Sequence, residues 1–381
     1  MRSIYLDHAA TTPPRPEAVE TLNLHLLRSF GNPSSLHHWG RDARAALDDA
    51  RDRVAACLGC HFSEIVFTAT GSEADNLALL GVAALTPRER RHLVTTAFEH
   101  HAILRTSEHL EEQGWRVTYV APTAEGLIDP SRVADAMTDG TALVSVMLAN
   151  NEIGTLQPLE EILRIAHAKG ALVHTDAVQA TGAVPINLGR LPVDLLSFTA
   201  HKFYGPRGAG GLFVRKGVQL ASEVLGGSQE RGRRAGTENV AAIAAMAVAL
   251  ELACAEQPSE MARQARLRDR LVAGVLNGIP RTRLNGHPTQ RLPNNANLAF
   301  EGVDGEALLL NLDLEGIACS GGSACASGAL EPSHVLLALG LSRELASSSV
   351  RFSVGRGTTE DDIDEALAVL ATTVERLRAC H

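Results

Sequence analysis

The sequence predicts an α/β protein with a mostly parallel sheet between helices, together with a smaller α+β domain. Short runs rich in apolar and β-branched residues alternate with helical patterns over the first two-thirds of the chain. The strand candidates are residues 64–68, 92–96, 116–120, 142–148, 171–177 and 195–199. Continuous apolar strands that alternate with helices favour a parallel sheet, because its strands are buried on both faces.

The helical patterns and a change in the residue pattern near residue 255 predict the domain organisation. Residues 160–170 form a helical pattern that ends in Gly170, as helices often do. After residue 255 a charged helical stretch at 261–279 precedes strand candidates at 294–300 and 350–355 and a closing helix at 361–379. We expect a large domain over 16–255 and a small α+β domain formed by 1–15 and 256–381.

Composition narrows the class of protein. The 381 residues carry a net charge of −9, which argues against nucleic acid as a direct partner. The N-terminus lacks the apolar core of a signal peptide, and the longest apolar run, 240–250, is too short to span a bilayer. Six cysteines without a secretion signal indicate a reducing compartment. We therefore expect a soluble, cytoplasmic protein that contacts no membrane.

Residues 57–61, CLGCH, match the C-x-x-C-H pattern of covalent haem attachment. Haem attachment requires export, for which the sequence shows no signal. The motif also follows a helical pattern and precedes a strand, so an ordinary helix-to-strand turn is favoured. A zinc site is not expected either, because no second Cys/His pair lies at ligand spacing. No resident metal is predicted.

The segment SFTAHKFYGPRGAGGLFV at 197–214 is the most informative. Lys202 follows a strand end and precedes a glycine-rich turn. A lysine is usually a solvated surface charge, but apolar, glycine-rich surroundings can desolvate it and favour a Schiff base. Asp176 ends another strand candidate and alone is equally well explained as a helix cap. Together the two residues fit pyridoxal phosphate, whose ring nitrogen a carboxylate keeps protonated.

Other residues complete such a site. TATGSEADN at 68–76 runs from a strand through Gly71 and Ser72 into a helix, whose first N–H groups and Ser72 hydroxyl suit a phosphate. Ser72 taken alone is equally an N-cap. His100 in FEHHAIL is either a ring that lies over the cofactor or an ordinary histidine. Asn151 in NNEIG follows a strand, at the carboxyl edge where α/β sheets bind ligands.

A series of motifs occurs along the chain in the order YLDHAATTP, GNPSS, TATGSEADN, EHHAIL, NNEIG, HTDAVQ, SFTAHKFYGP, RRAGTEN, SGGSAC and RFSVGR. This series resembles that of cysteine desulfurases of the IscS/NifS type, and the resemblance covers essentially the whole chain. The resemblance implies a class V pyridoxal-phosphate enzyme of fold type I, with a seven-stranded sheet in its large domain. The implied reaction converts L-cysteine to L-alanine. A selenocysteine lyase and an aminotransferase are alternatives with the same fold, and a cofactor-free scaffold is an alternative of another class.

The resemblance also assigns roles. Lys202 would carry the cofactor and remove the Cα proton, Asp176 would pair with the pyridinium, and His100 would stack on the ring and move protons. Arg351 would clamp the substrate carboxylate, with Asn151 beside it. The remaining cofactor contacts would be Asn151 and Gln179 near the phenolic oxygen, and Gly71, Ser72, Thr199, His201 and, from the partner subunit of a homodimer, Thr237 at the phosphate. Ser72 and Thr199 stand where the family commonly has Thr and Ser, and both keep a hydroxyl.

Cys325 lies in SGGSACASGALEP at 320–332, whose composition predicts a mobile loop. An inert loop cysteine is the alternative to the role that the resemblance implies. In that role Cys325 takes the substrate sulfur as a persulfide and delivers it to an iron–sulfur scaffold, a tRNA-thiolation enzyme or another acceptor. It could also ligate a scaffold-bound cluster transiently. Cys319 is expected to be a strand-end core residue. The chain ends at ERLRACH, where scaffold-serving relatives often continue, which predicts weaker scaffold docking.

Overall fold

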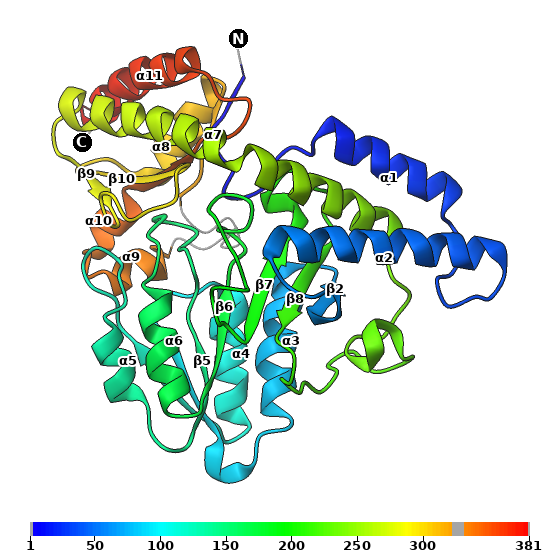
Figure 1. The fold of residues 1–381 in the computed structure, drawn as a ribbon. Helices are drawn as coiled ribbons and strands as arrows, with labels where there is room; N and C mark the ends of the chain where they lie inside the picture. The colour runs from blue at the N-terminus through cyan, green and yellow to red at the C-terminus, as the bar shows by residue number, and fades with distance from the viewer. Residues whose placement is uncertain (1–2, 322–330, 380–381) are drawn as a thin grey trace.

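The computed structural model describes residues 3–321 and 331–379, which are built around a seven-stranded sheet (Figure 1). The strand order is β2-β8-β7-β6-β5-β3-β4. The strands are β2 (Ile65–Thr68), β3 (His92–Thr96), β4 (Arg116–Val120), β5 (Thr141–Ser145), β6 (Leu172–Asp176), β7 (Leu195–Thr199) and β8 (Gly210–Val214). β8 is antiparallel to both neighbours and the other pairs are parallel. The predicted fold class is confirmed.

Successive side chains of these strands point to opposite faces, and helices cover both faces. Leu93, Leu143 and Leu195 pack in one cluster with α3 (Gly71–Ala83) and α4 (His101–Glu112). Their neighbours Val94 and Val144 belong to a larger core on the other face. The helices of that core include α1 (Pro16–Arg28), α2 (His38–Leu58), α5 (Pro130–Ala136), α6 (Leu159–Ala168) and the first half of α7 (Val240–Gly278). Burial on both faces explains the continuous apolar runs in the sequence.

A second core lies around two small sheets (Figure 1). The antiparallel sheet has the order β12 (Ser349–Ser353), β10 (Asn295–Phe300), β9 (Thr282–Asn285), and β1 (Ile4–Tyr5) pairs in parallel with β11 (Ile317–Ala318). They pack with the second half of α7, α8 (Gly305–Leu314) and α11 (Glu360–Ala379). The short helices are α9 (His334–Ala338), α10 (Arg343–Ser347), η1 (Phe62–Glu64), η2 (Arg88–Arg90), η3 (Ala200–Lys202) and η4 (Gln229–Gly232). The strands predicted at 294–300 and 350–355 are thus present as β10 and β12.

Helix α7 joins the two cores. It runs through the predicted domain boundary at 255/256 as one element of 39 residues, with Pro258 inside it. By length and composition α7 qualifies as a membrane span, but 61% of its most apolar window is buried, and its first half lies in the large core. We therefore describe α7 as a core helix. The division into domains 16–255 and 1–15 plus 256–381 stays a prediction.

The CLGCH motif is a helix-to-strand turn, as predicted. Helix α2 ends at Leu58, and Gly59 follows with φ 68°, the left-handed conformation that glycine adopts without strain. Cys57 and Cys60 pack against the large core. Among the residues that the structure describes, no three His, Cys, Asp or Glu side chains are grouped as a metal site requires.

Candidate active site

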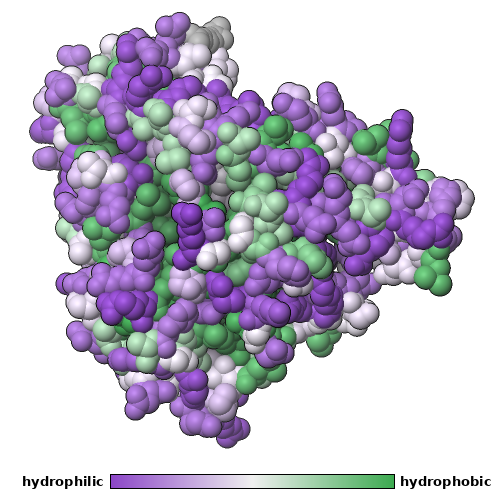
Figure 2. Space-filling view, in the orientation of Figure 1, coloured by the Kyte–Doolittle hydropathy of each residue, from purple (hydrophilic) through white to green (hydrophobic). Residues whose placement is uncertain are grey.

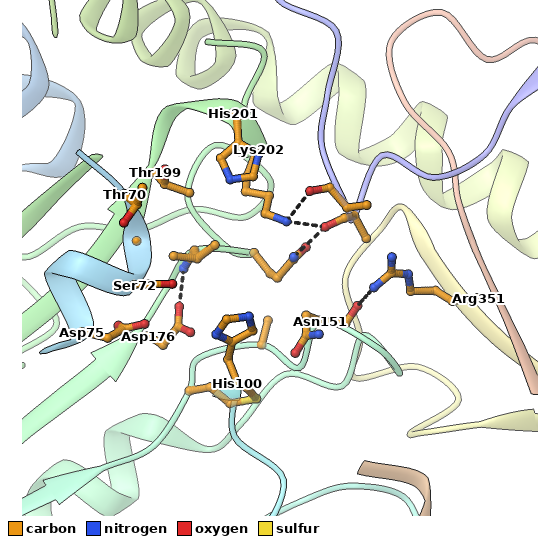
Figure 3. A pocket seen from close by; sticks show the side chains of 17 residues that line it. Thr70, Ser72, Asp75, His100, Asn151, Asp176, Thr199, His201, Lys202 and Arg351 are labelled. Atoms are coloured by element: carbon orange, nitrogen blue, oxygen red, sulfur yellow. Dashed lines mark hydrogen bonds between the residues drawn. The ribbon is translucent and has the colours of Figure 1, made fainter. Parts of the chain in front are cut away.

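A cavity of about 270 Å³ lies where strands β6 and β7 end (Figure 3). Most of the site residues predicted from the sequence line it, namely Gly71, Ser72, His100, Asn151, Asp176, Gln179, Thr199, His201, Lys202 and Arg351. Thr237 does not line it and lies exposed just before α7. Cys325 lies outside the described residues. Apart from Thr237, which was expected to act in a partner subunit, and Cys325, the structure therefore brings the predicted site residues together in one cavity.

Lys202 extends from η3, directly after β7, to the N-terminal segment. Its Nζ donates hydrogen bonds to the carbonyl oxygens of Ala9, at 2.6 Å, and Ala10, at 2.7 Å. Gln179 Nε2 also donates to the Ala9 oxygen, at 2.9 Å. The N-terminal segment thus fixes the amine at the cavity wall. No role was predicted for Ala9 and Ala10, although they belong to the YLDHAATTP motif.

Two buried carboxyl groups face the same cavity. Asp176 is the last residue of β6, and its Oδ1 accepts a hydrogen bond from the Val178 N–H at 2.8 Å. Burial raises the pKa of Asp176 to about 6. Asp75 of α3 is buried beside it, and burial, followed by the negative charge of Asp176, raises the pKa of Asp75. A cationic N–H donor in the cavity would stabilise this negative charge. Asp75 was missed, although it lies one helical turn after Gly71 in the TATGSEADN motif.

The start of α3 forms one wall of the cavity. Thr70 is the N-cap, and its side chain accepts from the Glu73 N–H at 3.0 Å. Ser72 is therefore not the cap, and its hydroxyl lies at the cavity (Figure 3). A Cβ on Gly71 would lie 2.7 Å from Val178 Cγ2, so this approach requires glycine. The first N–H groups of a helix have no intrahelical acceptor, which makes this wall a suitable anion site.

Two histidines at the cavity are neutral at pH 7. His100 caps α4, and its Nδ1 accepts from the Ala102 N–H at 3.1 Å, which assigns the ring proton to Nε2. Burial, followed by the charge of Lys202, lowers the pKa of His100 to about 4. His201 Nδ1 lies 3.1 Å from Thr11 Oγ1, and burial also lowers its pKa to about 4. Thr199 donates from its hydroxyl to the Ala209 oxygen at 3.1 Å.

Arg351 reaches the cavity from β12 and is 2% exposed. Its Nη2 donates to Asp7 Oδ1 at 2.8 Å, and its Nη1 donates to the Asn151 carbonyl oxygen at 3.0 Å. Arg351 Nε and Asn151 Oδ1 are buried and have no hydrogen-bond partner among the described residues. Buried polar atoms are usually paired, so these two indicate that the cavity binds a polar ligand.

Comparison with known proteins identifies the family. Residues 4–366 match the model of the class V aminotransferases. The chain belongs to this family. A relative named cysteine desulfurase IscS, from Dictyoglomus turgidum, is 47% identical over 99% of this chain and 96% of its own length. One of the same name from Methanosarcina thermophila is 47% identical over 99% of this chain and 93% of its own length.

Solved structures agree with this assignment to the class V family. A structure titled NifS-like protein superposes with a TM-score of 0.93 at 35% identity, over 99% of this chain and all of its own. The NifS-like protein from Rickettsia africae has a TM-score of 0.88 at 30% identity, over 98% of this chain and 100% of its own. The resemblance to cysteine desulfurases of the IscS/NifS type is confirmed, and the chain is an enzyme of that type. The roles of individual residues stay predictions.

Proposed function

We propose that this class V enzyme converts L-cysteine to L-alanine and leaves the sulfur as a persulfide on Cys325. The observation that carries the proposal is that Lys202, Asp176, His100 and Arg351, which are far apart in the sequence, line one cavity. The full-length relatives that are named cysteine desulfurases favour this reaction over those of a selenocysteine lyase or an aminotransferase. A solved relative is titled SspA in complex with cysteine, with a TM-score of 0.82 at 35% identity over 92% of this chain and 99% of its own.

The cavity fits pyridoxal phosphate, which we infer to be the cofactor. Asp176 would pair with the protonated ring nitrogen, and His100 would lie against the ring. The Asn151 amide, whose Oδ1 lacks a partner among the described residues, is available to a ligand together with Gln179. The phosphate would be held by Gly71, Ser72, Thr199 and His201. When bound, this cofactor draws the electrons of the substrate Cα–H bond into its ring.

The chain's own residues supply binding, proton transfer and the thiol. Arg351 orients the substrate carboxylate with its planar fork. Lys202 would anchor the cofactor and would remove the proton from the substrate Cα. The Cys325 thiolate then attacks the substrate sulfur, so that an S–S bond forms, the C–S bond breaks, and its electron pair passes to the carbon side. Protons returned by Lys202 and His100 complete L-alanine.

We further propose a homodimer. Thr237 is exposed in the described chain, as expected if it reaches the phosphate site of a partner subunit. Large apolar side chains are exposed around the connection between α1 and α2, at the right-hand edge of Figure 2. They are Leu26, Leu27, Phe30, Leu36 and Trp39, and Leu36 is 90% exposed. A C2 interface that covers both features would explain them.

The acceptor that we favour is an iron–sulfur scaffold protein, because the relatives carry the name IscS. A tRNA-thiolation enzyme or another sulfur acceptor would receive the same persulfide. We place the enzyme in the cytoplasm, where such acceptors and reduced thiols are found.

The proposed activity is tested on the purified holoenzyme with L-cysteine and dithiothreitol. We expect alanine and sulfide in equal amounts. Turnover of selenocysteine with none of cysteine would instead identify a lyase. Alanine formation that requires a 2-oxo acid and yields pyridoxamine phosphate would identify an aminotransferase. A purified protein that lacks pyridoxal phosphate and binds none would contradict the cofactor assignment and favour the scaffold alternative.

A further inference from the structure

A second thiol site lies away from the active-site cavity. Cys57 of α2 and Cys254 of α7 come from helices that run side by side (Figure 1). The two thiols lie close enough that each changes the pKa of the other. Both side chains are partly exposed and line a cavity of about 890 Å³ that shares no lining residue with the active site. A small solute can therefore reach both sulfur atoms from solvent.

An ion pair fixes the two helices beside this thiol pair. Arg53 and Glu251 lie about one turn before Cys57 and Cys254 on their respective helices. Arg53 Nε donates to Glu251 Oε2 at 3.1 Å, and the Nη2 of the same side chain also contacts that oxygen. The order of the two pairs shows that the helices are parallel here. The ion pair thus links the two helices about one turn from the point where Cys57 and Cys254 line the same cavity.

The two sulfur atoms have different acidities. The interaction with Cys57 lowers the pKa of Cys254, and the interaction with Cys254, followed by burial, raises the pKa of Cys57. Cys60 lies only three residues further along the chain, and burial raises its pKa to about 12. Cys254 is therefore the favoured nucleophile, because the thiolate is the reactive form of cysteine. Cys60 provides an inert comparison in the same turn.

We propose that Cys57 and Cys254 form a reversible redox pair, which a peroxide converts into a disulfide between α2 and α7. The Cys254 thiolate attacks one peroxide oxygen, so that an S–O bond forms, the O–O bond breaks, and the leaving oxygen departs as water after protonation. Cys57 sulfur then attacks the sulfenic sulfur, forming S–S and releasing the second oxygen as water. Two electrons pass from the sulfur atoms to the peroxide, and a dithiol reverses the change.

The geometry favours a disulfide over a metal site. A disulfide requires two cysteines on neighbouring segments, and Cys57 and Cys254 lie on adjacent helices and line the same cavity. In the described parts of the chain no third His, Cys, Asp or Glu completes a metal-ligand group at this pair. The cross-link would tie two helices of the large core together. Oxidised enzyme should therefore unfold at a higher temperature than reduced enzyme.

The test uses the Cys60→Ala holoenzyme, because tryptic peptides 54–88 and 235–263 then contain one cysteine each. The enzyme is treated with a small excess of hydrogen peroxide, alkylated, digested without reductant and analysed by mass spectrometry. We expect a peptide pair linked through Cys57 and Cys254 that dithiothreitol separates. In a Cys57→Ser variant, dimedone should label Cys254 as a sulfenic acid.

Wild-type enzyme and Cys254→Ser provide the controls, with circular dichroism to verify that each variant is folded. A folded Cys60→Ala enzyme that yields no linked pair would overturn the proposal. So would a linkage of either residue to Cys319 in place of its helical neighbour. Because the readout is a covalent link and not turnover, its failure is distinguishable from failure of the proposed desulfurase activity.

Discussion

Arg351 and Asp7 form an ion pair at the cavity, with Nη2 2.8 Å from Oδ1. The N-terminal segment and β12 are adjacent here, because Asp7 also bridges to Ser353. Arg351 Nη2 donates to the Asp7 carboxylate, and Arg351 Nη1 donates to the Asn151 carbonyl oxygen. A substrate carboxylate would therefore meet a side chain that is already oriented, which reduces the conformational entropy lost on binding.

Replacing Arg351 with lysine should weaken substrate binding while the cofactor stays bound. Lysine keeps the charge but lacks the planar fork that pairs with a carboxylate through two hydrogen bonds. We expect KM for L-cysteine to rise by about ten- to a hundredfold, with a smaller change in kcat. Steady-state kinetics and the visible spectrum of the variant measure the two effects. An unchanged KM would remove Arg351 from the substrate site.

Replacing Lys202 with alanine should abolish turnover, because the change removes both the proposed anchor of the cofactor and the base. Borohydride reduction of the wild-type holoenzyme followed by peptide mapping should place the cofactor on Lys202. Lys169 and Lys216 serve as internal comparisons in the same digest. Label on either of these lysines would show that the assignment is wrong.

Glu99 should make stability depend on pH. Its carboxyl is buried, and its Oε1 accepts from Thr96 Oγ1 and from the Met147 N–H. Burial raises the pKa of Glu99 from about 4.5 to about 8, so the native state keeps a proton that the unfolded chain releases. The contribution of protonated Glu99 to the free energy of unfolding is therefore complete below pH 4.5. It is lost as the pH rises to 8, by about 1.4 kcal/mol per pH unit.

Denaturant unfolding of wild-type enzyme and of Glu99→Gln between pH 5 and pH 8 measures this effect. The variant should lack the part of the slope that Glu99 contributes, so the difference between the two stabilities should shrink or change sign as the pH rises. Parallel curves for the two proteins would mean that Glu99 is ionised in the native state.

Arg51 and Glu230 form a buried pair that should be sensitive to removal of one partner. Their two hydrogen bonds measure 2.8 and 2.6 Å, and Glu230 also accepts from the Phe67 N–H at 3.0 Å. Glu230→Gln should lower the unfolding free energy by about 3 kcal/mol, because it leaves a buried guanidinium without its counter-charge. The double variant Arg51→Met, Glu230→Leu should recover much of the loss. Equal destabilisation by both variants would contradict this explanation.

The fold was predictable because each buried strand appears in the sequence as a short run rich in apolar and β-branched residues. Runs such as 92–96 and 195–199 place buried leucine or valine side chains on both faces of the sheet and became β3 and β7. Lys202 and Asp176 were found for a related reason, since each lies at the end of such a run. Local patterns therefore predicted both the sheet and the edge at which the cavity lies.

Contacts between distant segments were not predictable in the same way. The Lys202 amine binds the carbonyl oxygens of Ala9 and Ala10, and backbone carbonyls have no sequence signature. Asp75 was missed because its burial follows from the packing of α3 on the sheet. Ser72 was the N-cap candidate in the sequence, and only the backbone geometry assigns the cap to Thr70.

The central claim is that sulfur leaves L-cysteine for Cys325, a residue outside the described part of the chain. Single-turnover reactions of wild-type, Cys325→Ala and, as the matched control, Cys319→Ala holoenzymes with L-cysteine test it directly. Mass spectrometry of alkylated peptides then locates the persulfide. We predict a persulfide on Cys325 and stoichiometric alanine in the wild type and in Cys319→Ala. Cys325→Ala should bind cysteine and form neither product. Wild-type rates of alanine formation in Cys325→Ala would contradict the account.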